Sequence, residues 1–109
     1  MASITLYHGT NADSAKSILD SGIIDSGSYY GGIVGVALTP RKNIAEDFAG
    51  EGGAVFQVIV PVERLVVDPE SYDPDLMGDV ANAIDDGASV YALGDGEKFV
   101  SVAWLNYDA

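Results

Sequence analysis

The chain has 109 residues and a formal net charge of −12, from 17 acidic and 5 basic residues, and 48% of its residues are hydrophobic. This length and composition predict one folded domain over residues 1–109 with a real core. With no cysteine and a single histidine, the sequence excludes disulfides, thiol nucleophiles and two-histidine metal sites, and we expect no metal site.

The strong negative charge also bears on partners. It repels phosphate backbones, so direct nucleic-acid binding is disfavoured, and it favours a basic or nucleic-acid-binding protein as partner. No segment approaches the roughly 20 apolar residues of a membrane helix, and the N-terminus lacks the charged-then-apolar pattern of a signal peptide. We therefore expect a cytoplasmic protein that does not engage membranes.

Hydrophobic periodicity predicts strands that alternate with helices along the chain. Strands are expected at residues 4–7, 33–39, 54–60, 65–67, 88–93 and 98–105. Helices are expected at 12–19, capped by Thr10 or Asn11, at 40–49, with Thr39 as cap and Pro40 in the first position, and at 76–84. The last two strands are spaced like a hairpin whose loop carries Asp95 and Glu97.

The stretch from Tyr7 to Thr10 follows the first apolar strand and contains the only histidine. Gly9 lets a ligand approach the backbone beside His8, and a helix begins directly afterwards, as in a pocket at the end of a strand. Taken alone, the stretch better fits a strand-end histidine that backbone hydrogen bonds hold in place.

Two further stretches are candidates for a site. Asp95 and Glu97 are two residues apart with a glycine between them, and paired carboxylates stabilise the positive charge of an oxocarbenium ion. Tyr29 and Tyr30 lie in a glycine- and serine-rich segment, 25–32, which is either a substrate-binding lid or an ordinary connection.

Three segments together resemble the ADP-ribosyltransferase superfamily. Tyr7-His8-Gly9-Thr10 is similar to the first motif of the branch with a catalytic His-Tyr-Glu set. Gly35 to Thr39, with the following Ala45 to Ala49, resembles the second motif. Gly96 to Val102 resembles the third motif, in which the catalytic glutamate opens a strand.

This resemblance implies a split, strongly curved mixed β-sheet with flanking helices and a cleft between its halves, and NAD as the cofactor and ADP-ribose donor. It implies that His8 holds a ribose hydroxyl, that the Gly9 backbone binds the nicotinamide amide, and that Glu97 stabilises the transition state while Asp95 faces the acceptor. The aromatic ring on nicotinamide is Phe48, Tyr29 or Tyr30, because Ala37 and Leu38 stand where many relatives have a tyrosine. Tyr7, Thr10 and Thr39 complete the cofactor-binding set.

The expected function is therefore transfer of ADP-ribose from NAD to a protein, with release of nicotinamide. The small size and acidity are similar to those of phage-encoded transferases that modify host or CRISPR proteins, which would place this chain in a host cytoplasm. Two alternatives stay open. One is a non-catalytic acidic binding protein that mimics nucleic acid, and the other is an RNA 2′-phosphotransferase, which five basic residues disfavour.

Overall fold

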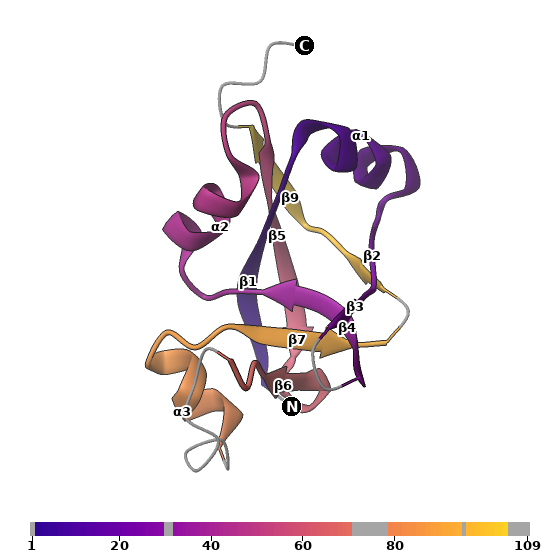
Figure 1. Cartoon of the computed structure of the whole chain (residues 1–109). Helices are drawn as coiled ribbons and strands as arrows, with labels where there is room; N and C mark the ends of the chain where they lie inside the picture. The colour runs from indigo at the N-terminus through magenta and orange to yellow at the C-terminus, as the bar shows by residue number, and fades with distance from the viewer. Residues whose placement is uncertain (1, 30–31, 71–78, 95, 105–109) are drawn as a thin grey trace.

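The structure is a computed structural model that describes residues 2–29, 32–70, 79–94 and 96–104. One sheet has the order β1-β5-β9 and is formed by the long strands β1 (Ser3–Thr10) and β5 (Ala54–Pro61) with β9 (Ser101–Trp104). β1 pairs with β5 along its whole length, from Ser3 opposite Pro61 to Thr10 opposite Ala54. Figure 1 shows β1 and β5 running side by side from the lower to the upper part of the molecule, with β9 beside β5 in the upper part.

A second sheet has the order β3-β4-β7-β6 and crosses the first sheet near one end of β1 (Figure 1). Its strands are β3 (Gly27–Tyr29), β4 (Ile33–Leu38), β7 (Val90–Leu93) and β6 (Leu65–Val67). A two-stranded sheet pairs β2 (Ile23–Asp25) with β8 (Gly96–Lys98). A 3₁₀ turn at Val62–Arg64 connects β5 to β6.

The two larger sheets meet at an antiparallel bridge between Tyr7 of β1 and Thr39, the residue after β4. The amide of Tyr7 donates to the Thr39 carbonyl at 2.8 Å, and the amide of Thr39 donates to the Tyr7 carbonyl at 2.9 Å. The strand that carries His8 is therefore fixed against the end of β4.

In the described ranges, three α-helices connect or cover the strands. α1 (Ala12–Ser21) is capped by Asn11, whose side chain accepts a hydrogen bond from the Ser14 amide. Of the two predicted caps, Asn11 is therefore the correct one and Thr10 is not. α2 (Lys42–Ala49) packs on β1 and β5, and α3 (Val80–Asp85) contacts β6.

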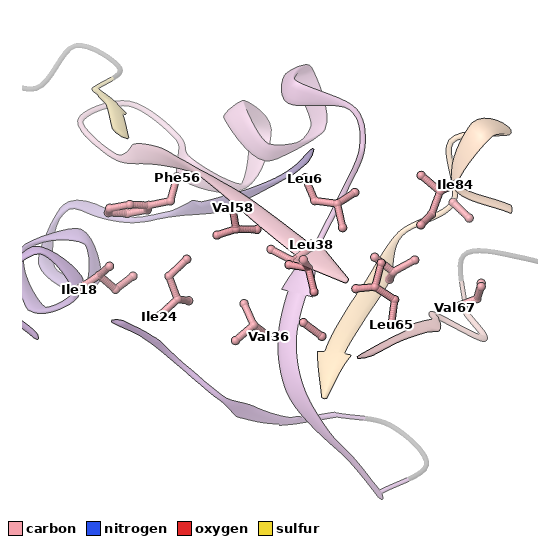
Figure 2. Close-up of a cluster of buried hydrophobic side chains, with 14 of the residues drawn as sticks. Leu6, Ile18, Ile24, Val36, Leu38, Phe56, Val58, Leu65, Val67 and Ile84 are labelled. Carbon is pink, nitrogen blue, oxygen red and sulfur yellow. The ribbon is translucent and has the colours of Figure 1, made fainter. Parts of the chain in front are cut away.

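The main core lies between the sheets (Figure 2). Alternate residues of β1 and β5 point inward and meet side chains from β4 and β6, because the side chains of a strand alternate between its two faces. α1 and α3 add side chains at opposite ends of this core. The labelled members in Figure 2 are Leu6, Ile18, Ile24, Val36, Leu38, Phe56, Val58, Leu65, Val67 and Ile84.

The predicted combination of strands with flanking helices is confirmed as an α+β domain, but the prediction of a mixed sheet is wrong. Every strand pairing in the described ranges is antiparallel. The reason is that α1 and α2 each carry the chain from one sheet to another instead of connecting parallel neighbours in one sheet.

Three local predictions also need correction. β7 pairs with β4 and β6, whereas β9 pairs with β5, so the predicted hairpin does not form. α2 begins at Lys42 with Arg41 as its cap, so Thr39 and Pro40 precede the helix. Thr39 instead forms the bridge to Tyr7, and its hydroxyl accepts from the Arg41 amide at 3.2 Å. The segment 25–32, expected as a loop, begins with Asp25, the last residue of β2, and contains β3.

Candidate functional site

A cavity of about 390 Å³ opens where the two larger sheets meet, a size within the range of small-molecule sites. β1 contributes Tyr7, His8 and Gly9, and the end of β4 contributes residues 37–39. α2 contributes Ala45 and Phe48, and the remaining lining residues are Asp68, Glu70 and residues 89–91. The bridge between Tyr7 and Thr39 thus forms part of the cavity wall.

His8 is held in one orientation by β4. Its Nδ1 lies 2.8 Å from the Ala37 carbonyl oxygen, and because a carbonyl can only accept, Nδ1 carries the proton. Burial lowers the pKa of His8 below the usual 6.5, and this effect outweighs the opposite effect of the hydrogen bond to Ala37. The ring is therefore neutral at pH 7, and its Nε2 is a hydrogen-bond acceptor suited to a ligand hydroxyl.

Gly9 is required by packing as well as by the cavity. A Cβ atom at Gly9 would lie 1.7 Å from the carbonyl oxygen of Ala45, which is far inside contact distance. The missing side chain thus lets the backbone of α2 lie directly on β1. This close packing places Phe48, one turn after Ala45, at the rim of the same cavity.

Aromatic rings and carboxylates characterise the remaining wall. Tyr7, Tyr91 and Phe48 line the cavity, and Phe48 is 73% exposed. Asp68 and Glu70 also line the cavity. Within the described ranges, no lysine or arginine lines this cavity.

Asp68 and Glu70 are candidate site residues that sequence reasoning missed. The Asp68 amide donates to the Ser89 carbonyl at 2.9 Å, which connects the end of β6 to the start of β7. The Glu70 amide donates to Oδ1 of Asp68 at 2.9 Å. Two carboxylates at a spacing of two, directly after a strand, resemble the pattern of Asp95 and Glu97 and could have indicated this pair.

Glu97 lies elsewhere, and the structure does not bring it together with His8. It pairs with Ile24 across the β2–β8 sheet, is 6% exposed and is not among the residues that line the cavity. Its Oε1 forms an ion pair with Nη2 of Arg64, without hydrogen-bond geometry. The same Nη2 donates to the Leu93 carbonyl at 2.9 Å.

Several other predicted site residues are not among the described residues that line the cavity. Thr10 pairs with Ala54 at the end of β1 and does not line the cavity. Tyr29 contributes backbone to β3. Tyr30, Asp95 and the Tyr29 side chain lie outside the described part of the structure.

The cavity thus combines a neutral histidine acceptor, aromatic surfaces and two carboxylates. Such a set suits a planar, positively charged group that carries hydroxyls. Among the described helices, the longest of which has ten residues, none is long and apolar enough to span a membrane. Comparisons with protein-family models, with curated proteins and with solved structures find no match for this chain.

Proposed function

We propose that this cavity binds the nicotinamide riboside part of NAD and that the protein is a mono-ADP-ribosyltransferase acting on a protein acceptor in the cytoplasm. The observation that carries the proposal is the conjunction of aromatic rings, His8 and the Asp68–Glu70 pair in one cavity at the junction of two sheets. A split sheet with a cleft at its junction is also what the resemblance of the sequence motifs implies.

The chemistry of NAD fits this wall. Its nicotinamide is a planar cation, which aromatic faces and carboxylates attract. The ribose hydroxyls are donors for the acceptor atom Nε2 of His8. With no lysine or arginine among the described lining residues, the phosphates would lie outside the cavity, towards solvent.

The proposed reaction breaks the bond between the nicotinamide nitrogen and C1′ of the ribose. The bonding electron pair leaves with nicotinamide, which becomes neutral, and positive charge develops on the ribose. Asp68 and Glu70 stabilise that charge more in the transition state than in the ground state, which is the condition for raising the rate. A nucleophile of the acceptor then bonds to C1′ and loses its proton to a carboxylate or to water.

This proposal transfers the role first predicted for Glu97 to the carboxylates that line the cavity. Glu97 is buried, forms an ion pair with Arg64 and does not line the cavity that contains His8. We therefore assign Glu97 a structural role and retain His8, Gly9, Tyr7, Thr39 and Phe48 as the predicted residues that line the site.

The test measures nicotinamide release from NAD by the purified protein, with and without a lysate of acceptor proteins. Asp68→Asn and Glu70→Gln keep the side-chain shape and remove the charge, and the more important of the two should lose about 10²–10³-fold in rate. Glu63→Gln is the matched control, because Glu63 is exposed in the 3₁₀ turn and does not line the cavity. Equal rates in all four proteins would contradict the assigned role of the pair.

One observation favours a second candidate, an acidic binding protein without catalysis. The net charge is −12, because 17 acidic residues stand against 5 basic residues. Salt-sensitive binding to a basic partner, with no NAD binding and no nicotinamide release, would favour this candidate.

A further inference from the structure

The outward face of α2 combines an exposed ring with unpaired carboxylates. Ala45 and Ala49 are buried beneath the helix, whereas Phe48 is 73% exposed and Asp47 is exposed next to it. Glu51 is exposed in the turn that follows. In Figure 1, α2 lies at the edge of the molecule, with one side against β1 and β5.

The C-terminal end of α2 is electrostatically negative for two reasons. The helix has no basic residue in its last turn, so its terminal carbonyls are not balanced by a cation. Asp47 and Glu51 add two charges, and within the described ranges neither forms an ion pair. The basic residues Arg41 and Lys42 lie at the other end of the helix, where Arg41 donates to the Asp86 carbonyl at 3.2 Å.

An arginine side chain matches this surface better than other groups. Its planar guanidinium stacks on an aromatic face and donates to carboxylates at the same time, whereas an ammonium group acts as a point charge. Phe48 supplies the ring, and the exposed residues Asp47 and Glu51, which do not line the cavity, supply the carboxylates. Phe48 also lines the cavity, so a chain held here would lie next to the proposed site.

We propose that the α2 face formed by Asp47, Phe48 and Glu51 docks an arginine-rich segment of the acceptor protein and presents that protein to the cavity. The inference that the docked protein is the acceptor rests on the proposed function. The docking itself depends only on the helix face and on charge complementarity, so it is testable in the absence of NAD.

The experiment titrates the ¹⁵N-labelled protein with a hexa-arginine peptide and, separately, with a hexa-lysine peptide. Amide shifts should concentrate in residues 43–51, and hexa-arginine should bind more tightly than hexa-lysine. Asp47→Asn/Glu51→Gln should weaken hexa-arginine binding about three- to tenfold, and Phe48→Ala about two- to fivefold. Asp20→Asn/Glu63→Gln removes the same charge from exposed positions of α1 and the 3₁₀ turn and should change binding less than twofold.

Equal weakening by the two double variants would show binding to the overall charge, and it would overturn the docking proposal, as would shifts that concentrate away from α2. Unchanged thermal midpoints of the variants ensure that the effect is one of binding. Nicotinamide release, measured separately on the same proteins, tests the proposed function. Peptide binding at α2 without any release would refute the transferase and leave the docking surface standing.

Discussion

The ion pair between Glu97 and Arg64 allows the structural role of Glu97 to be separated from a catalytic one. The Glu97 side chain is 7% exposed and that of Arg64 is 39% exposed. Removing one partner of a fully buried pair costs about 3–5 kcal/mol, because the remaining charge is left without compensation. Since water reaches Arg64, we expect smaller losses of unfolding free energy than for a fully buried pair. Arg64→Met leaves the buried carboxylate unpaired and should cost about 2–3 kcal/mol, and Glu97→Gln should cost about 1–2 kcal/mol.

The measurement is urea unfolding of both single variants and of Arg64→Met/Glu97→Gln, followed by circular dichroism. The double variant should recover about 1–2 kcal/mol relative to the sum of the single changes, because it leaves no stranded charge. Arg64→Met should lower the thermal midpoint by about 10–20 °C in a domain of this size. Lys98→Met is the control and should change stability by less than about 0.5 kcal/mol, since Lys98 is exposed next to Glu97.

Additive single changes, within about 0.3–0.5 kcal/mol, would refute the pairing of Arg64 with Glu97. A Glu97→Gln protein of full stability that had lost NAD turnover would return Glu97 to the catalytic role predicted from the sequence. Both results are obtained from the same three variants.

Three further predictions concern the cavity. Gly9→Ala should lower the unfolding free energy by about 3 kcal/mol or prevent folding, because its Cβ would lie 1.7 Å from the Ala45 carbonyl oxygen. Urea unfolding measures this cost, and a value below about 1 kcal/mol would contradict the packing of α2 on β1. Burial keeps the His8 pKa below 6.5, so the folded state binds fewer protons than the unfolded state below that pH. The stability that the neutral His8 contributes is therefore fully present above about pH 6.5 and is lost as the pH falls. His8→Gln should flatten the decline of the unfolding free energy between pH 7 and 5. Phe48→Ala should leave the thermal midpoint unchanged, since the ring is 73% exposed, and weaken NAD binding by about 0.5–1.5 kcal/mol in calorimetry; unchanged affinity would exclude ring stacking by Phe48.

Local patterns predicted most of the secondary structure. The strand before His8 and the strand that became β5 were predicted from runs of apolar residues. The helix after Asn11 was predicted from the spacing of its apolar residues. These signals depend on residues close in sequence, so a single chain contains them.

Strand partners could not be predicted in the same way. The spacing of the last two long strands suggested a hairpin, but β7 packs Val90 and Ala92 into the core between β4 and β6. The choice of partner depends on which sheet buries those side chains, and that is set by tertiary packing.

The same limit applied to the site. His8 and Gly9 could be found because they end a strand beside a helix, but Asp68 reaches the cavity only through the pairing of β6 with β7. Glu97 had an equally attractive local sequence, but its partner Arg64 lies far from it in the sequence, so no local pattern indicates their ion pair. Long-range contacts therefore decided which carboxylates line the cavity.

The central claim is that the cavity beside His8 binds NAD and that its carboxylates drive loss of nicotinamide. The most direct measurement is calorimetric NAD binding, together with nicotinamide release, for the parent protein and for Asp68→Asn/Glu70→Gln. We predict that the parent binds NAD and releases nicotinamide, and that the double variant folds normally and loses release by at least about 10²-fold. A parent protein that neither binds nor consumes NAD, or a double variant that releases nicotinamide at the parent rate, would contradict it.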